Sequence, residues 1–294
     1  MMVPATALNG LKRQRPEWEP WLALVEEILR EAQTPAWDTA VPSLDRMGLE
    51  AAVPLLAGAA VSVQTNSVRR LLERLIRIAS RGGTPKMATL ESALNADLDV
   101  LILFEASVCQ DGARLMEVAA RMGVDGEAFQ AVIALASVPF LYACNRSWAS
   151  SISQSWVEGY CPVCGSWPAF AEVRGIDRTR YFRCGRCGGE WHARSLHCPY
   201  CANTDHDGLV SLKAENTDSA ATIEACQRCL GYVKTFTRLQ GCSPGTVMLE
   251  DLGSVALDIA ALEHGYSRTP GAGYTLQVTV RDGGARRRLF AWNA

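Results

Sequence analysis

Four stretches of the form Cys-x-x-Cys decide the fold of this chain: Cys161-Pro-Val-Cys164, Cys184-Gly-Arg-Cys187, Cys198-Pro-Tyr-Cys201 and Cys226-Gln-Arg-Cys229. They contain eight of its eleven cysteines. A Cys-x-x-Cys turn brings two thiolates to one point in space, and two such turns complete a tetrahedral site for zinc or iron. The pattern therefore predicts two metal ions with these eight cysteines as ligands.

The spacing favours pairing the turns in sequence order. The first two turns are separated by 19 residues, as in a zinc ribbon, and the last two by 24. Interleaved pairing would need loops of 33 and 38 residues. Structural disulfides and thiol exchange are the other interpretations, but a thioredoxin-like motif is single and lies in a βαβ unit. Cys109, Cys144 and Cys242 lack partner spacing and are expected to be buried small side chains.

Composition indicates a globular protein of about two domains, with 294 residues, 48% hydrophobic residues and a formal charge of −2. The N-terminus lacks the apolar core of a secretory signal, so we expect a cytoplasmic chain whose cysteines stay reduced. The longest apolar stretches, Ala51–Val63 and Ala131–Cys144, are too short to span a bilayer and are expected to be buried helices.

The predicted fold class is α+β: an N-terminal all-α domain, two tandem rubredoxin-like or zinc-ribbon four-cysteine modules, and a C-terminal helix. The predicted boundaries are 1–155 for the helical domain, 156–197 and 198–250 for the two ribbons, 251–268 for the C-terminal helix, and 269–294 for a tail of unknown role. Apolar periodicity predicts helices over Pro20–Ala32, from Asn66 to Gly82, over Ala88–Val108, and over Gly126–Tyr142 with a break at Pro139.

Short β-type runs alternate with turn residues after position 155. The runs are Ala169–Val173, Tyr181–Phe182, Leu209–Lys213, Thr222–Glu224 and Tyr232–Arg238. They predict small hairpins that need bound metal for stability. The C-terminal helix, Asp251–Tyr266, is expected to bury Leu252, Val255, Ile259 and Leu262. The tail holds a candidate hairpin, Tyr274–Val280 with Arg286–Phe290, in which Arg286, Arg287 and Arg288 form a solvated face.

Catalytic patterns are missing from the sequence. We find no Ser/His/Asp set, phosphate loop or carboxylate pair at usable spacing, and a closed four-thiolate site lacks the open position that metal catalysis requires. His192 and His197 lie beside the cysteine turns, but each site already has four thiolates, so a structural or contact role is expected. The sequence therefore predicts a protein that is not an enzyme.

Several of these motifs together resemble the FdhE-type formate dehydrogenase accessory proteins. The resemblance rests on Tyr160–Pro168, Arg180–Cys187, Glu190–His192, the two later cysteine turns and Glu250–Asp258. It covers about residues 155–268, extends more loosely over the helical half, and ends after about Arg268.

The resemblance implies a cytoplasmic, non-enzymatic assembly factor. Such proteins bind the catalytic subunit of a respiratory formate dehydrogenase before its export, and their rubredoxin-like sites are associated with iron. By carry-over, the eight cysteines would hold two iron ions, with zinc as the alternative. Whether the chain forms a homodimer is left open.

Two other functions remain as alternatives. A nucleic-acid-binding zinc ribbon has little support, because residues 155–250 carry ten basic and ten acidic side chains, although residues 174–194 hold six arginines. A rubredoxin-like electron carrier would suit iron but leaves the helical domain without a purpose.

Overall fold

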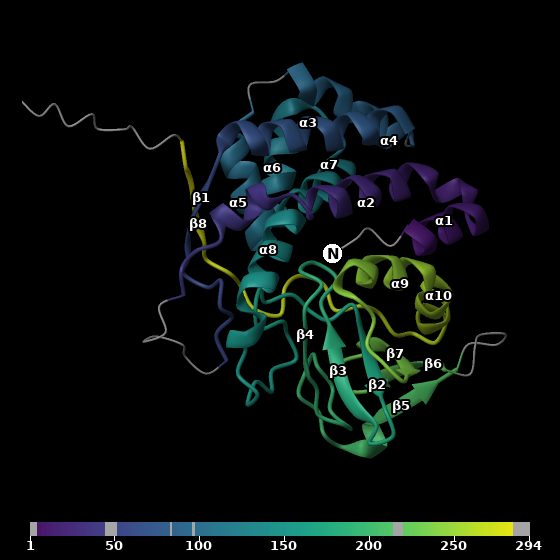
Figure 1. The fold of residues 1–294 in the computed structure, drawn as a ribbon. Coiled ribbons are helices and arrows are strands. Elements are labelled where there is room, and N and C mark those ends of the chain that lie inside the picture. The colour runs from purple at the N-terminus through teal and green to yellow at the C-terminus, as the bar shows by residue number, and fades with distance from the viewer. Residues whose placement is uncertain (1–4, 45–51, 83, 96–97, 214–219, 285–294) are drawn as a thin grey trace, which may run out of the picture.

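The computed structural model describes residues 5–44, 52–82, 84–95, 98–213 and 220–284. Figure 1 shows a helical layer built from the N-terminal half, above a twisted sheet built from the C-terminal half. The last two helices, α9 and α10, lie beside the sheet on the side that faces the helical layer. The predicted mixed helix-and-sheet class is confirmed.

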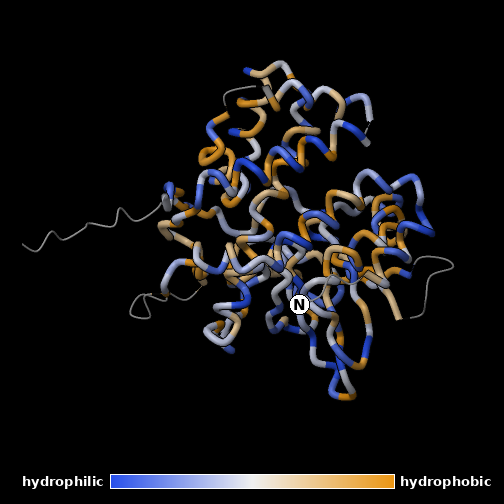
Figure 2. The backbone as a smooth tube through the Cα atoms, turned by 45° about the horizontal axis from the view of Figure 1, so that its top comes forward, coloured by the Kyte–Doolittle hydropathy of each residue, from blue (hydrophilic) through white to orange (hydrophobic). Residues whose placement is uncertain are grey.

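The N-terminal half is helical, as predicted. Its elements are α1 (Ala5–Gln14), η1 (Pro16–Trp18), α2 (Glu19–Glu31), η2 (Pro35–Ala40), α3 (Thr65–Gly82), α4 (Pro85–Ala88), η4 (Thr89–Asn95), α5 (Val100–Cys109), α6 (Gly112–Met122), α7 (Gly126–Ile133), η5 (Ala134–Ser137), α8 (Val138–Trp148) and η6 (Ala149–Ser151). Hydrophobic and hydrophilic residues are mixed along the helical segments (Figure 2), and in α3 the buried residues Val68, Leu71, Leu72, Leu75, Ile76 and Ala79 form one apolar face toward the common core.

Two helix predictions were wrong in extent. The predicted helix over Ala88–Val108 is divided between η4 and α5, because the Asp99 carboxylate accepts hydrogen bonds from the backbone N–H groups of Leu101 and Ile102 and starts a new helix. The helix predicted over Gly126–Tyr142 is interrupted close to Pro139, as predicted, because α7 ends at Ile133 and α8 begins at Val138 after η5, but α8 continues beyond Tyr142 to Trp148. Pro139 lies in the first turn of α8, where the missing N–H costs no hydrogen bond.

The helical run Gly126–Ser151 is long and apolar enough to cross a membrane by length and composition alone. This run is longer than Ala131–Cys144, the apolar stretch identified from the sequence. However, 78% of its apolar window is buried inside the fold, and its residues Phe140, Leu141 and Tyr142 lie in the main hydrophobic core. It is therefore packed like the core helix of a soluble protein.

Within the described residues, the C-terminal half forms a six-stranded sheet in the order β4-β3-β2-β7-β6-β5. The strands are β2 (Phe170–Arg174), β3 (Thr179–Arg183), β4 (Glu190–His192), β5 (Leu209–Leu212), β6 (Ala221–Cys226) and β7 (Tyr232–Arg238). The five predicted runs are all strands, whereas β4 was not predicted. The short helices η7 (His206–Gly208) and η8 (Pro244–Thr246) lie in the connections.

The two ribbons share this sheet. The first contributes β2, β3 and β4, and the second contributes β5, β6 and β7, each as antiparallel strands. A parallel pairing of β2 with β7, in which Phe170 lies opposite Lys234, joins them. The predicted division into two ribbons at residues 197 and 198 stays a prediction, and the strands on both sides of this division belong to one continuous sheet.

A second, two-stranded sheet joins distant parts of the chain. β1 (Ala60–Val63) pairs in parallel with β8 (Thr279–Asp282). The prediction that Ala51–Val63 is a buried helix was therefore wrong: its described residues, 52–63, form turns followed by β1, and no helix. The predicted tail hairpin was also wrong in its first arm, Tyr274–Val280, because the end of this arm pairs with β1. The second arm, Arg286–Phe290, lies outside the described residues.

The C-terminal helix was predicted in the right place, and Leu252 packs against the main core, but two of the four residues predicted to be buried are exposed. It is divided at Ser254 into α9 (Val247–Gly253) and α10 (Val255–Glu263), and α10 buries Leu257 and Ala261 against the sheet. Ile259 and Leu262 are 52% and 59% exposed. Asp258 directs this orientation, because its carboxylate contacts the buried Lys234 of β7.

Candidate metal centres

The structure groups the eight cysteines as the spacing predicts. Cluster 1 consists of Cys161, Cys164, Cys184 and Cys187, and cluster 2 of Cys198, Cys201, Cys226 and Cys229. All sulfur atoms within a cluster lie within 4.8 Å of one another. The Sγ–Sγ distances between turns are 3.5 and 3.5 Å in cluster 1 and 3.6 and 3.7 Å in cluster 2.

These distances fit a metal-binding tetrahedron. Metal–sulfur bonds of about 2.3 Å in a regular tetrahedron place the sulfurs roughly 3.8 Å apart. The donor set is four cysteine sulfurs in each cluster, which suits zinc and iron equally. The eight residues therefore fit two metal ions.

The four turns have one backbone design. In each, the N–H of the first cysteine donates to the carbonyl five residues later, at 2.9 Å in all four turns. The carbonyl of the first cysteine in turn accepts from the N–H four residues later. These four donors are Gly165, Gly188, Ala202 and Leu230. These two hydrogen bonds give all four turns the same backbone conformation.

The same four residues have a left-handed backbone, with φ of 70° and 69° at the two glycines and 57° and 58° at Ala202 and Leu230. Glycine adopts this conformation without steric cost, whereas a residue with a Cβ is strained in it. Cluster 1 therefore uses the favoured residue in both turns, and cluster 2 in neither.

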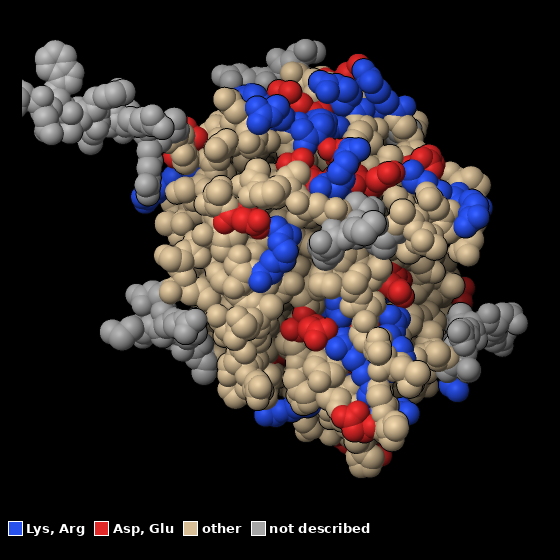
Figure 3. All heavy atoms as spheres, viewed as in Figure 1, with Lys and Arg blue, Asp and Glu red and all other residues tan. Residues whose placement is uncertain are grey.

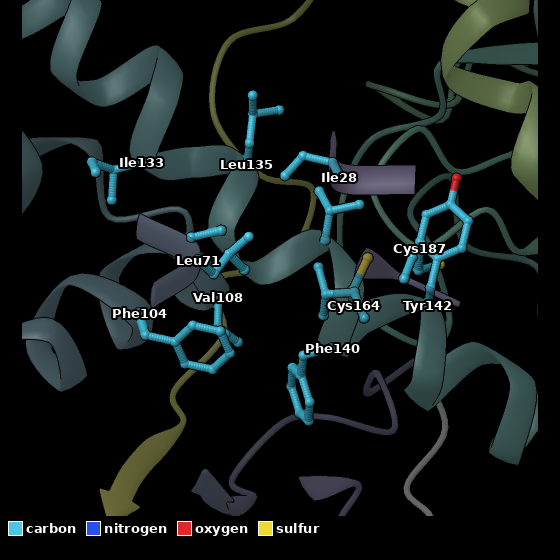
Figure 4. Close-up of a cluster of buried hydrophobic side chains, with 14 of the residues drawn as sticks. Ile28, Leu71, Phe104, Val108, Ile133, Leu135, Phe140, Tyr142, Cys164 and Cys187 are labelled. Atoms are coloured by element: carbon cyan, nitrogen blue, oxygen red, sulfur yellow. The ribbon is translucent and has the colours of Figure 1, made fainter. Parts of the chain in front are cut away.

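Cluster 1 lies in the main hydrophobic core. Its four cysteines are at most 1% exposed and belong to the same buried cluster as the helical domain. Figure 4 shows Cys187 beside the ring of Tyr142 from α8, and Cys164 above Phe140. Two segments also bind its first turn through the backbone: Leu55 N–H donates to the Pro162 carbonyl, and Tyr274 N–H donates to the Gly165 carbonyl.

Arg186, between the two cysteines of the second turn, reaches into the helical domain. Its guanidinium donates to the carbonyls of Ser107 and Val108 in the last turn of α5, and to Ser137 Oγ. A cation is favoured at the C-terminal end of a helix, where carbonyl groups lack partners. The cluster 1 turn is thereby tied to the helical layer.

Cluster 2 lies outside the main core and its turns are more open. Cys198 and Cys226 are buried, but Cys201 is half-buried and Cys229 is exposed. Asn203 Nδ2 lies 3.7 Å from Cys226 Sγ and donates toward it. A cavity of about 400 Å³ borders the cluster, with Cys198 and Cys226 in its wall.

The thiols of each cluster differ in acidity. Burial raises the pKa of Cys161 and of Cys198 above the ordinary thiol value. Hydrogen bonding from Cys161 lowers the pKa of Cys164. Burial also acts to raise the pKa of Cys226, but the backbone N–H groups of Cys229 and Arg228 bring it down to about 7. A cation bound among four such sulfurs would favour their ionised form.

The remaining cysteines and both histidines lie outside the two clusters, as far as the described residues show. Cys144 is buried as predicted, but Cys109 and Cys242 are half-buried. His192 is exposed on β4 and packs edge-on against Tyr181. His197 is half-buried, and burial lowers its pKa.

Two buried ion networks, which sequence reasoning missed, hold the sheet between the clusters. The fully buried Glu172 carboxylate contacts the guanidiniums of Arg174, Arg183 and Arg238. Lys234, also fully buried, contacts Asp251 and Asp258 from α9 and α10. The second network explains the acidic residues of the Glu250–Asp258 motif, since they attach both helices to β7.

Four of the six arginines of residues 174–194 are held in contacts within the fold, whereas Arg178 and Arg194 are exposed. Arg174, Arg180 and Arg183 are ion-paired to glutamates with side chains that are 15%, 5% and 1% exposed, and Arg186 is used as described above. On the face in Figure 3, basic and acidic side chains are intermingled. This distribution disfavours nucleic-acid binding, which uses exposed cations.

Comparison with known proteins finds similarity in sequence over the cysteine-rich half. Residues 160–195 match the family model described as the FdhE central domain, and residues 196–274 match the FdhE C-terminal domain. Similar curated proteins are the FdhE homologues of Pseudomonas aeruginosa (34% identical over 114 residues) and Aquifex aeolicus (31% over 116 residues). These matches cover 37% and 38% of this chain.

The matched segments span only 37% and 40% of those two relatives. The crystal structure of the FdhE protein from Pseudomonas aeruginosa is similar over 92% of this chain and 93% of that chain, with a TM-score of 0.53 and 21% identity. At this identity the likeness concerns the fold. It extends the resemblance in architecture to the helical half.

Proposed function

We propose that this chain, which is of the FdhE type, is a cytoplasmic assembly factor that binds the catalytic subunit of a respiratory formate dehydrogenase before export. In this proposal it performs no catalysis. Its eight clustered cysteines hold two metal ions, which are iron, with zinc as the alternative, and which stabilise the sheet and its loops.

The observation that supports this function best is the coincidence of two features. The region that matches the FdhE domains, residues 160–274, is the region that contains all four cysteine turns and both buried ion networks. The motifs that carry the family resemblance therefore build the fold of this half. A rigid surface of this kind suits a protein that docks on a client with little rearrangement.

Co-purification is the direct test of client binding. The chain and the catalytic subunit of a formate dehydrogenase from the same organism are co-expressed with different tags and purified without oxygen. We expect a stable complex, and no complex with an unrelated exported molybdoenzyme as the control. Complementation of a strain that lacks its own FdhE protein would then measure formate dehydrogenase activity.

Failure of co-purification both with and without oxygen, from a chain that is folded and metal-loaded, would refute the proposed client. Metal analysis tests the other half of the proposal, with two equivalents per chain expected. A visible thiolate-to-iron absorption band distinguishes iron from zinc.

A further inference from the structure

The two clusters differ in how well the protein covers them. Every cysteine of cluster 1 is buried, whereas in cluster 2 Cys201 is half-buried and Cys229 is exposed. The difference does not come from the turns, since all four have the same hydrogen bonds. It comes from what packs over them.

The residue with a left-handed backbone that follows each Cys-x-x-Cys turn shows this difference in packing. A Cβ added at Gly165 would lie 3.0 Å from the Tyr274 carbonyl, and one at Gly188 would lie 2.9 Å from the Pro244 carbonyl. A side chain at either position would therefore collide with backbone that covers cluster 1. Cluster 2 carries real side chains at the matching positions, Ala202 and Leu230, and Leu230 is 53% exposed. Both of these side chains are exposed.

Opening the two clusters therefore requires different movements. For cluster 1, Arg186 must leave the end of α5, and the backbone bonds from Leu55 and Tyr274 must break. For cluster 2, the Cys226 turn is bound from the C-terminal segment through Ser267 N–H, which donates to the Leu230 carbonyl. Local openings that break few contacts have the smallest free energies.

A competing ligand must reach a metal ion or its sulfurs to remove it. From these differences we infer that cluster 2 is the exchangeable centre, where metal enters and leaves the folded protein through the face around Cys229. Cluster 1 holds its metal as long as the helical layer and the sheet stay together. The inference rests on the metal binding proposed above and assigns different roles to the two sites.

The test uses the full chain loaded with two equivalents of Zn²⁺ in the absence of oxygen. A coloured chelator in excess reports zinc release, and timed alkylation with mass spectrometry reports which thiols become free. We expect two phases of one equivalent each, with rates at least about tenfold apart. Cys229 and Cys201 should be alkylated in the fast phase, and Cys161 and Cys184 in the slow phase.

Two variants separate the clusters. Cys229→Ser should bind one equivalent and retain the slow phase unchanged, because its substitution lies on the exposed side of cluster 2. Leu230→Gly removes an exposed side chain without touching a sulfur and should leave both equivalents bound. Loss of the slow phase in Cys229→Ser would overturn the inference.

The remaining outcomes are equally decisive. A chain that binds two equivalents and releases both at one rate, or that is alkylated first at Cys161 or Cys184, overturns the inference and leaves the proposed metal binding intact. A folded chain that retains no zinc, with all eight cysteines alkylated together, overturns the metal binding itself.

Discussion

Substitution of Gly188 by alanine tests whether close packing over cluster 1 stabilises the protein. Gly188 has φ of +69°, and an added Cβ would lie 2.9 Å from both the Cβ and the carbonyl oxygen of Pro244. The left-handed backbone alone costs about 1–2 kcal/mol for a residue with a Cβ. Forcing a methyl group against backbone adds about 1–3 kcal/mol. The free energy of unfolding should therefore fall by about 2–5 kcal/mol.

Gly123 provides a matched control for the backbone term. Its φ is +68°, but an added Cβ would have no heavy atom within 4 Å. Gly123→Ala should therefore lose only the backbone contribution of about 1–2 kcal/mol. Urea unfolding of both zinc-loaded variants, followed by circular dichroism, gives the comparison. If Gly188→Ala is no less stable than Gly123→Ala, the packing argument for cluster 1 is wrong.

Three further predictions concern the contacts around the clusters. Arg186→Ala leaves the carbonyls at the end of α5 without their cation and should lower the free energy of unfolding by about 3 kcal/mol. The control is Arg121→Ala, at an exposed position, which should change this free energy by under about 0.5 kcal/mol in the same urea titration. Burial acts to raise the pKa of Asp258, but Lys234 and Arg268 lower it below its usual value. The unfolded state therefore binds more protons than the folded state. The stabilisation from Asp258 is present above about pH 4 and is lost as the pH falls through the pKa of the folded state. The stability difference between the natural chain and Asp258→Asn should accordingly shrink between pH 5 and the acid limit in denaturation curves, and a constant difference would contradict this. Cys164→Ser and Cys201→Ser should each reduce the metal content by one equivalent, while Cys109→Ser keeps both, as measured by elemental analysis.

Local signals made much of the C-terminal half predictable. The grouping of the cysteines followed from loop length, and the five predicted strands followed from short apolar runs bounded by turn residues. Both features depend on residues close together in the sequence. The three-residue strand β4 was missed because it is too short to show a period.

Non-local contacts explain the errors. The pairings of β2 with β7 and of β1 with β8 join segments that have no sequence signal for each other. The face of α10 was misassigned because apolar periodicity was followed, whereas the buried Lys234 attracts Asp258 inward and leaves Ile259 and Leu262 exposed. Four of the arginines that appeared as a basic patch in the sequence are held within the fold, because they contact glutamates of other strands or, for Arg186, α5 and η5.

The parallel pairing of β1 with β8 also has a consequence for the order in which the chain folds during synthesis. Ala60 lies opposite Thr279, so β1 leaves the ribosome long before its partner. At about 5–20 residues per second, this delay is roughly 10–40 s. Through that interval the turns of cluster 1 can close, but the edge of β1 has no strand beside it. The pairing of β1 with β8 therefore has to wait for the C-terminal segment, and a nascent chain that stalls before Thr279 keeps an open strand edge that other chains can pair with.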